Sequence, residues 1–404
     1  MKIYNKSEWK KVKLGDACDK VISGEWGTEV DENSQNTAFI IRTTNFSNNG
    51  KIDIENKELV KRKIDEIKIK EKSLKKGDII IEKSGGSSNQ PVGRVVYFNL
   101  DTNDIFLCNN FTSILRINEK INSKYIFYFL RNSYKNNKVI KYQNKTTGII
   151  NLKLKDYLKE NYLFLPKLEI QNKIVNILDN LEILLEKNQK YLIYLKELNK
   201  SLFTRMFGDI RTNSFNWKKV KLQDVCSSIV RGPFGSSLKK EFFVKNGYKV
   251  YEQKNAINQS ADLGEYYIDE KKFKELQRFE CKMGDIIMSC SGTVGKLFQL
   301  PENSKRGIIN QALCKFSLNN KINLTYFLKY LEKVIGNIEL NGSGIKNISS
   351  ISYIKKIDIN LPPIELQNKF AERIEKIEKL SFEIEKSIKE AENLYNSLMN
   401  KYFE

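Results

Sequence analysis

Short polar loops carry the side chains with the most specific hydrogen-bonding chemistry in this sequence. Arg, Asn and Gln can form paired hydrogen bonds with the edges of guanine or adenine, whereas Ser, Thr and Lys bind phosphate oxygens. In the first half the candidate contacts are Arg42, Thr43, Thr44, Asn45, Lys83, Ser84, Ser87, Asn89, Gln90 and Arg94. In the second half they are Arg231, Phe234, Ser236, Ser237, Lys239, Gln253, Lys254, Asn255, Ser291, Thr293 and Lys296. Any single loop could be an ordinary solvated turn, but recurrence at matching places favours a DNA-reading surface.

The sequence contains no histidine, which removes many of the usual catalytic and metal-binding arrangements. A Ser-His-Asp triad, a Cys-His pair and a His-ligated zinc are excluded. The six cysteines lie far apart without metal-ligand spacing, which indicates free thiols in a reducing compartment. Gly292-Thr293-Val294-Gly295-Lys296 lacks the spacing of a nucleotide-binding loop, and no glycine-rich cofactor fingerprint is visible. These exclusions leave catalysis by carboxylates, Lys or Tyr open but make an enzyme less favoured, and we expect no catalytic residue, no metal and no cofactor in this chain.

Lysine dominates the charge of this 404-residue chain, whose formal net charge is +20. The excess is typical of a protein that binds a polyanion such as nucleic acid. An AT-rich genome would produce a similar excess, since Lys, Asn and Ile are all abundant. The length allows two to three domains. No signal peptide and no apolar run of membrane-spanning length is visible, so we expect a soluble cytoplasmic protein without a membrane partner.

A sequence block in the middle of the chain returns about two hundred residues later. Leu165-Pro166-Lys167-Leu168-Glu169-Ile170-Gln171-Asn172-Lys173 reappears as Leu361-Pro362-Pro363-Ile364-Glu365-Leu366-Gln367-Asn368-Lys369, an offset of 361 − 165 = 196. The same offset carries Phe207 onto Phe403. An internal repeat of this kind predicts two folding units built on the same plan.

The repeat continues upstream with offsets that change along the chain. Trp9 returns as Trp217, an offset of 217 − 9 = 208, and Asp78 returns as Asp285, an offset of 207. Asn110 is predicted to correspond to Asn310, an offset of 200. Loops that face a partner can change length, whereas two rods that must match each other cannot. The pattern therefore predicts variable recognition surfaces on a constant scaffold.

Two long helices are predicted to begin at the repeated blocks, because apolar residues recur there at spacings of three and four. Asn188 interrupts the first pattern, and Arg373 and Ser387 interrupt the second. A lone Asn in a coiled-coil seam commonly fixes the register. About 35 residues at 1.5 Å each give a rod of roughly 50 Å. The predicted spacer residues are Ile170, Ile174, Ile177, Leu181, Leu184, Asn188, Leu195, Leu198, Leu366, Phe370, Ile377, Leu380, Ile384 and Leu394.

The alternative to pairing is that each helix packs on its own globular core. If the helices pair, an antiparallel arrangement is favoured because the second globular part follows directly after the first helix, near Phe207. That arrangement relates the halves by pseudo-twofold symmetry and holds two recognition surfaces at a fixed spacing, as proteins that read split DNA sites require.

Each globular part is predicted to be an α+β module with an irregular sheet. Short β-type runs occupy 39–41, 78–81 and 93–98 in the first half, and 247–251 and 285–288 in the second. Helical patterns follow at 124–131 and 324–333. The expected domains are a first recognition domain (1–165), a first spacer helix (166–208), a second recognition domain (209–361) and a second spacer helix (362–404).

The sequence resembles a specificity subunit of a type I restriction–modification system over essentially its whole length. The doubled Leu-Pro-x-x-Glu-[Ile/Leu]-Gln-Asn-Lys block and the run Ser201-Leu202-Phe203-Thr204-Arg205-Met206-Phe207-Gly208 carry the resemblance. The two Trp-Lys-Lys-Val-Lys-Leu segments and Arg231-Gly232-Pro233-Phe234-Gly235-Ser236-Ser237-Leu238-Lys239 also fit. No single motif would suffice, but the combination is specific.

The resemblance implies two target-recognition domains that each read half of a split site in double-stranded DNA, with two antiparallel helices as spacer. It implies a chain without activity of its own that binds two modification subunits, which methylate adenine with S-adenosylmethionine. Restriction subunits, using ATP and Mg²⁺, would complete an endonuclease. A fused methyltransferase would need an added catalytic domain. The remaining alternative is a coiled-coil scaffold without sequence-specific DNA binding.

Overall fold

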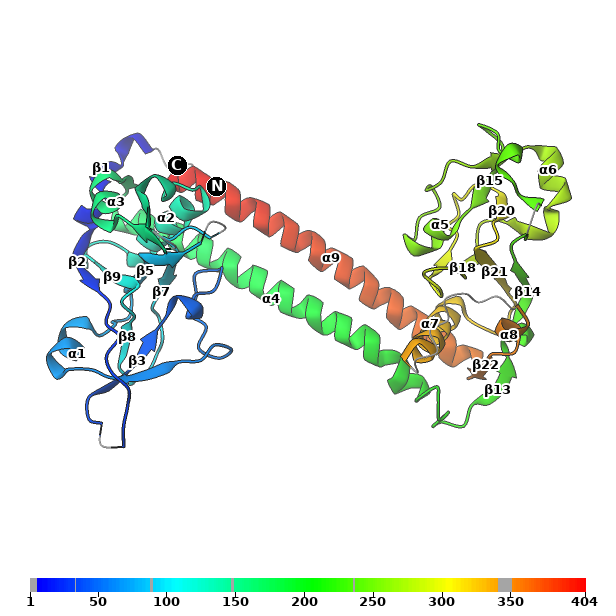
Figure 1. Ribbon diagram of the computed structural model, residues 1–404, viewed down its shortest axis with the longest axis horizontal. Helices are drawn as coiled ribbons and strands as arrows, with labels where there is room; N and C mark the ends of the chain where they lie inside the picture. The colour runs from blue at the N-terminus through cyan, green and yellow to red at the C-terminus, as the bar shows by residue number, and fades with distance from the viewer. Residues whose placement is uncertain (1–5, 33, 88–89, 147–148, 235–236, 341–350) are drawn as a thin grey trace. The chain divides into compact units, whose positions relative to one another are not determined.

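The computed structural model divides the chain into two compact units, which are drawn in Figure 1. Unit 1 comprises Met1–Gln189 together with Lys386–Glu404, and unit 2 comprises Lys190–Glu385. The structure describes residues 6–32, 34–87, 90–146, 149–234, 237–340 and 351–404. Each unit therefore combines one globular part with a segment of each long helix.

Unit 1 contains two main sheets, both built from short strands. The first sheet has the order β2-β9-β5-β7 and is antiparallel throughout, and the second has the order β4-β3-β8, in which β3 and β8 are parallel. The strands of unit 1 are β1 (Lys10–Lys13), β2 (Cys18–Ser23), β3 (Thr37–Ile41), β4 (Val60–Lys63), β5 (Ile79–Glu82), β6 (Ser84–Gly86), β7 (Val95–Tyr97), β8 (Phe106–Cys108), β9 (Thr112–Ile117), β10 (Gln143–Thr146), β11 (Ile149–Leu152) and β12 (Tyr162–Leu165).

Unit 2 repeats this plan with the orders β14-β21-β18-β19 and β16-β15-β20-β17. Its parallel pair is β15 with β20, the counterpart of β3 with β8. The strands of unit 2 are β13 (Lys218–Lys221), β14 (Cys226–Arg231), β15 (Tyr248–Tyr251), β16 (Tyr267–Ile268), β17 (Glu280–Cys281), β18 (Ile286–Ser289), β19 (Leu297–Gln299), β20 (Gly307–Ile309), β21 (Leu313–Leu318) and β22 (Asp358–Leu361). The predicted α+β class, with sheets of short strands, is confirmed.

The helices confirm the predicted positions of the long rods. The helix α4 spans Leu168–Phe207 and α9 spans Ile364–Phe403, each 40 residues long. The shorter helices are α1 (Glu66–Lys72), α2 (Ser123–Lys135), α3 (Leu154–Glu160), α5 (Gln253–Ile257), α6 (Glu270–Glu275), α7 (Leu324–Leu340) and α8 (Ile351–Lys355). Among the described residues, no helix is both long and apolar enough to cross a membrane.

The repeated Gln-Asn pair explains why the block at the start of each long helix recurs. The buried Gln171 side chain accepts a hydrogen bond from the Asn122 backbone N–H (2.9 Å) and donates one to the Pro166 carbonyl (2.8 Å). Gln367 makes the same two bonds with Asn323 N–H and the Pro362 carbonyl, both at 2.8 Å. Since Asn122 and Asn323 begin α2 and α7, the block fixes each long helix to the neighbouring helix of its own unit.

Within unit 1 the first part of α4 and the last part of α9 run antiparallel. Tyr395 donates a hydrogen bond to Glu182 (2.9 Å), and Asn188 donates one to Ser387 (3.1 Å). The residue number thus rises along α4 while the number of its partner in α9 falls. At the end of α9, the Phe403 ring lies 5.1 Å from the Tyr125 ring of α2, centroid to centroid. The expected antiparallel arrangement is therefore present inside this unit.

Unit 2 contains the matching arrangement of helix segments. The Phe207 ring at the end of α4 lies 4.7 Å from Tyr326 of α7 and 5.2 Å from Phe370 of α9. Tyr326 is the counterpart of Tyr125, and both donate a hydroxyl hydrogen bond to the backbone near the start of a long helix. Phe207 and Phe403 therefore share an offset because each ring packs on the corresponding helix, α7 or α2, of its unit.

Four of the predicted spacer residues are more exposed than residues in the buried seam of a coiled coil. Leu184, Leu198, Leu380 and Leu394 are 41%, 37%, 46% and 43% exposed. A pair of helices covers a seam residue from one side only, so side chains away from the globular parts stay partly exposed. Ile174, Phe370 and Ile377 are buried, because they also join the cores of their units. The alternative, packing on globular cores, thus describes part of each helix.

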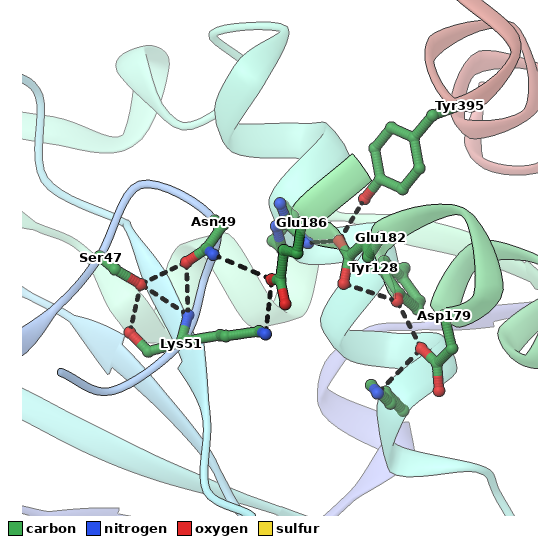
Figure 2. A network of polar contacts seen from close by, with 10 residues as sticks. Ser47, Asn49, Lys51, Tyr128, Asp179, Glu182, Glu186 and Tyr395 are labelled. Carbon is green, nitrogen blue, oxygen red and sulfur yellow. Dashed lines mark hydrogen bonds and ion pairs between the residues drawn. The ribbon is translucent and has the colours of Figure 1, made fainter. Parts of the chain in front are cut away.

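A network of polar contacts ties α2 and α4 to the end of α9 in unit 1, as Figure 2 shows. Tyr128 donates to Asp179 (2.5 Å) and lies 3.1 Å from Glu182. Arg131 forms an ion pair with the same Glu182, and both side chains are 18% exposed. Burial is the first cause that raises the pKa of the Tyr128 hydroxyl, followed by Glu182 and Asp179. Tyr128 therefore remains a neutral donor.

Unit 2 leaves a groove at the corresponding place. By the offsets of the repeat, Tyr128 and Arg131 correspond to Lys329 and Glu332, and Glu182 corresponds to Glu378 (378 − 182 = 196). Those three residues line a cavity of about 630 Å³ that also borders the segment 294–297. The polar network is thus a feature of unit 1 rather than of the repeat.

Candidate nucleic-acid interface

In each unit the predicted loops converge where several strands end. In unit 1, the Gly24 N–H donates to the Thr112 carbonyl (3.1 Å) and the Asn109 N–H to the Ile41 carbonyl (3.0 Å). The Lys83 N–H, just after β5, donates to the Phe111 carbonyl (2.9 Å). These bonds join the ends of β2, β3, β5 and β8 at one edge. We call this region the strand-end platform.

Unit 2 builds its strand-end platform with the same backbone bonds. Gly232 N–H donates to the Leu313 carbonyl (3.0 Å), Asn310 N–H to the Tyr251 carbonyl (2.9 Å), and Cys290 N–H to the Ala312 carbonyl (2.8 Å). The predicted loops at 231–239, 252–255 and 291–296 therefore begin from one edge of the unit. The loops recur at matching places in the two units because the same backbone hydrogen bonds hold the strand ends from which they start.

Glycine is required where the platform is tightest. A Cβ atom on Gly24 would lie 1.9 Å from the Asn109 carbonyl oxygen, and one on Gly232 would lie 1.8 Å from that of Asn310. Asn109 is therefore the counterpart of Asn310, so the predicted correspondence of Asn110 with Asn310 is wrong by one residue. The two adjacent asparagines made the sequence alignment ambiguous.

The structure gives Asn45 and Asn255 a different role from the predicted base contact, since both are fully buried. Asn45 accepts from the Arg42 N–H (3.0 Å) and donates to the Asp53 carbonyl (3.2 Å). Asn255 accepts from the Glu252 N–H (2.8 Å) and donates to the carbonyls of Ser260 and Leu263. Each amide closes its own loop, so neither side chain reaches a surface where DNA could lie.

The residues beside these buried amides differ between the units. Arg42 donates through Nη2 to the Glu58 carbonyl (2.9 Å) and forms an ion pair with its carboxylate (3.4 Å). At the corresponding position, Glu252 pairs with Lys254 (2.9 Å). The loop closed by the buried asparagine is therefore shared, but the charge of the residue three positions before that asparagine is reversed, from Arg42 to Glu252. Thr43 lies in the same loop of unit 1, where its carbonyl accepts from Arg94 Nη2 at 3.4 Å, and Thr44 follows it.

Arg94 is held in unit 1 by a two-point ion pair. Its Nε and Nη2 donate to the two carboxylate oxygens of Glu82, both at 2.9 Å. Glu82 is 4% exposed and Arg94 is 19% exposed. The hydrogen bond to Glu82 is the main cause that raises the pKa of Arg94. The guanidinium therefore joins β5 to the loop before β7 and offers only a small surface to a ligand.

Of the remaining candidates of unit 1, Lys83 lines a basic groove. Lys83 donates to Ser23 Oγ (3.2 Å), and burial lowers its pKa. Ser84 donates to Asn151 (2.6 Å), while Ser87 and Gln90 are exposed. Asn89 lies outside the described residues. The groove next to Lys83 has a volume of about 580 Å³ and is lined by Lys13, Gly15, Asp16, Val21, Ser23, Lys83, Ser113, Leu154, Lys155, Leu158 and Lys159.

In unit 2, Arg231 and Phe234 lie together on the platform. Arg231 is 8% exposed and donates through Nε to the Gln311 carbonyl (3.0 Å), and its guanidinium lies 5.6 Å from the centroid of the Phe234 ring. Phe234 is 60% exposed. Ser237 is exposed, Lys239 lies 3.7 Å from Glu241, and Ser236 lies outside the described residues.

The segment 291–296 approaches the loop at 253–255. A Cβ on Gly292 would lie 3.9 Å from Gln253 Nε2, so the two predicted loops are neighbours. Thr293 and Lys296 are exposed, Ser291 is half-buried, and the Lys296 N–H donates to Ser289 Oγ (2.9 Å). The loops at 253–255 and 291–296 therefore lie next to each other in unit 2.

Sequence reasoning missed Trp26, which occupies the position of Phe234 in unit 1. The offset that joins Trp9 to Trp217 also joins the two aromatics (234 − 208 = 26) and the two platform glycines (232 − 208 = 24). The Trp26 ring has the Arg62 guanidinium 4.7 Å from its centroid. Applying that offset to the second-half loop would have identified it.

Comparisons with known proteins agree with this doubled plan. A family model described as the type I restriction modification DNA specificity domain matches residues 6–195 and 215–392. A relative from Haemophilus influenzae, described as a putative type I restriction enzyme specificity subunit, is 26% identical over 289 residues, which are 68% of this chain and 69% of the relative.

Two solved structures have a similar fold. The S subunit of a type I restriction–modification system from M. genitalium is 16% identical, with a TM-score of 0.54 over 100% of this chain and 98% of that one. A chain from a structure that describes complex assembly and conformational transition of the type I R-M system is 16% identical, with a TM-score of 0.51 over 98% of this chain and 97% of that one.

Proposed function

The chain belongs to the type I restriction–modification DNA specificity family, and from this premise we propose that each unit reads one half of a split DNA site through its strand-end platform. The chain is a DNA-sequence specificity subunit. A coiled-coil scaffold without sequence-specific binding is not favoured, because the family match covers both globular parts.

One observation carries the proposal. The two platforms share their backbone bonds and their close-packed glycines but differ in the side chains they display, such as Arg42 against Glu252. A shared frame with different hydrogen-bonding groups suits two readers that recognise different base sequences. The net charge of +20 favours attraction to the DNA backbone.

We further propose that α4 and α9 set the gap between the half-sites and offer their exposed faces to two modification subunits. In this proposal the partners hold S-adenosylmethionine and methylate adenine, and restriction subunits, where present, use ATP and Mg²⁺. The equal length of the two helices, 40 residues each, supports a spacer role. Insertion of whole heptads into both helices is expected to change the gap, and an unchanged gap would remove the spacer role.

The experiment that tests the reading function is a gel shift with the chain bound to its modification subunits. We expect one DNA sequence to bind far more tightly than a scrambled duplex, with affinity falling steeply as salt rises. Methylome sequencing of the host first supplies the two half-sites and their gap. Equal binding to all duplexes would contradict the proposal.

A further inference from the structure

The two platforms carry an aromatic residue two positions after the close-packed glycine. The segments are Gly24-Glu25-Trp26 in unit 1 and Gly232-Pro233-Phe234 in unit 2. Each ring has a guanidinium against it, with centroid distances of 4.7 Å for Arg62 on Trp26 and 5.6 Å for Arg231 on Phe234. An aromatic ring with a guanidinium against it therefore occupies the same place in both units.

The backbone that leads to Phe234 is firmly held. Gly232 is fixed by its N–H bond to Leu313 and by contact with the Asn310 carbonyl, and Pro233 is buried. Proline also restricts the backbone directly before the ring. Arg231 is itself buried and bonded to the Gln311 carbonyl, so it supports the ring from a fixed position.

The two rings differ in how far they are exposed. Trp26 packs against the apolar cluster of Ala38, Ile40, Ile64 and Leu107, which half-buries it. Phe234 belongs to none of the apolar clusters found among the described residues and is 60% exposed. The exposed phenyl ring thus follows a firmly held backbone at the edge where the predicted loops of unit 2 begin, and it is available to a ligand that lies on the platform.

We propose that Phe234 inserts between two neighbouring base pairs of the half-site read by unit 2. This inference rests on the proposed function, because a DNA duplex must lie on the platform for the ring to reach a base step. Apolar side chains that enter a base step unstack it and kink the duplex, and the sequence dependence of that deformation adds specificity. Trp26, covered by its own domain, holds its loop and does not insert.

The test uses the chain assembled with its modification subunits and a duplex that contains the native split site. The adenine analogue 2-aminopurine replaces, in each half-site in turn, adenines other than the one that is methylated, since its fluorescence rises when its base unstacks and a methyltransferase flips its own target base. We expect a rise in one half-site only. Phe234→Ala should abolish that rise and weaken binding of the native site by about tenfold or more, with binding of scrambled DNA unchanged. Phe234→Leu should retain part of both effects.

Phe215→Ala is the matched control, because Phe215 is also exposed (50%) but lies between α4 and β13, with its ring 6.2 Å from that of Trp217. It should behave as the unchanged protein does. Tight, specific binding without any fluorescence rise would overturn insertion, as would a Phe234→Ala protein with the original affinity and signal. Binding of native and scrambled DNA with equal affinity by the unchanged protein would instead overturn the reading function itself.

Discussion

Asn188 of α4 donates a hydrogen bond of 3.1 Å to Ser387 of α9 inside unit 1. Asn188 interrupts the apolar pattern of α4, and Ser387 is one of two residues that interrupt the pattern of α9, the other being Arg373. The structure shows that Asn188 and Ser387 meet. Both side chains are half-buried, so each supplies the other with a partner that the apolar seam lacks. The pair therefore favours one register of α4 against α9 over registers shifted by a turn.

A double-mutant cycle measures this pairing. Asn188→Ala and Ser387→Ala should each destabilise unit 1, and the double variant should be destabilised by less than the sum, with a coupling of about 0.5–1.5 kcal/mol. Thermal unfolding followed by calorimetry provides the free energies. Strict additivity of the two changes would mean that the hydrogen bond contributes nothing to stability.

Arg94→Ala tests whether this arginine is structural. Removing it leaves the nearly buried Glu82 carboxylate without its two-point partner, and we expect a loss of about 3 kcal/mol of stability in unit 1. The double variant Arg94→Met/Glu82→Leu should recover most of that loss, because it removes both charges. If Arg94→Ala keeps full stability but loses one half-site, the arginine is a base contact after all.

Asn255→Ala should destabilise unit 2 by about 2 kcal/mol or more, since it leaves one buried N–H and two carbonyls without partners. Asn258→Ala, in an exposed amide that bonds only the Lys254 carbonyl, is the matched control and should be nearly neutral. Chemical denaturation reports both. A stable Asn255→Ala protein with altered base preference would restore the original prediction of a base contact.

Glu25 should make unit 1 sensitive to acid. A hydrogen bond from Lys72, aided by Lys68, holds the pKa of the Glu25 carboxyl below its usual value. Because the folded pKa is depressed, this carboxylate stabilises the fold above its usual pKa, and the stabilisation is lost as the pH falls through the folded value. Glu25→Gln should flatten the dependence of Tm on pH below about 4.5.

Glu280→Gln provides the comparison in unit 2, where a hydrogen bond from Arg306 similarly lowers the pKa of Glu280. This change should leave the acid sensitivity of unit 1 intact. Hydrogen exchange of each unit as a function of pH separates the two effects. Identical pH profiles for the original protein and Glu25→Gln would contradict the assignment.

Arg131→Leu should destabilise unit 1 by about 3 kcal/mol, because Glu182 would lose its ion-pair partner within a partly buried network. The corresponding change in unit 2, Glu332→Leu, removes an ion pair of 3.6 Å between Glu332 and Lys329, in which the Glu332 side chain is 68% exposed. It should change stability by less than about 0.5 kcal/mol. Equal effects of the two substitutions would show that the network of Figure 2 adds nothing special to unit 1.

The repeat, the long helices and the α+β plan were predictable because periodicity and turn chemistry are local properties of a sequence. The role of Asn45 was not, since a polar residue after a strand looks the same whether its amide faces DNA or closes its own loop. Burial decides between these roles, and burial depends on strands distant in sequence. Trp26 was missed for a different reason: its repeat partner was noticed, but the offset was not carried back.

The exposure of the leucines in α4 and α9 could not be predicted from the sequence either. An apolar period predicts which face of α4 is shared, but it does not tell how many neighbours cover each turn. Ile174 is buried in the core cluster that residues of α2 and α9 also join, whereas Leu184 is 41% exposed and joins none of the clusters of the described residues. The seam pattern was therefore a sound guide to pairing and a poor guide to the burial of individual residues.

Unit 1 is assembled from two separated stretches of chain, and this has a consequence during protein synthesis. Its core includes Leu398, Met399, Tyr402 and Phe403, which follow the whole of unit 2 along the chain. At roughly 5–20 residues per second, the 385 − 190 + 1 = 196 residues of unit 2 delay those side chains by on the order of 10–40 s. The half translated first is thus the half whose core closes last, and the nascent chain exposes Tyr125 and its neighbours to chaperones and proteases for that interval.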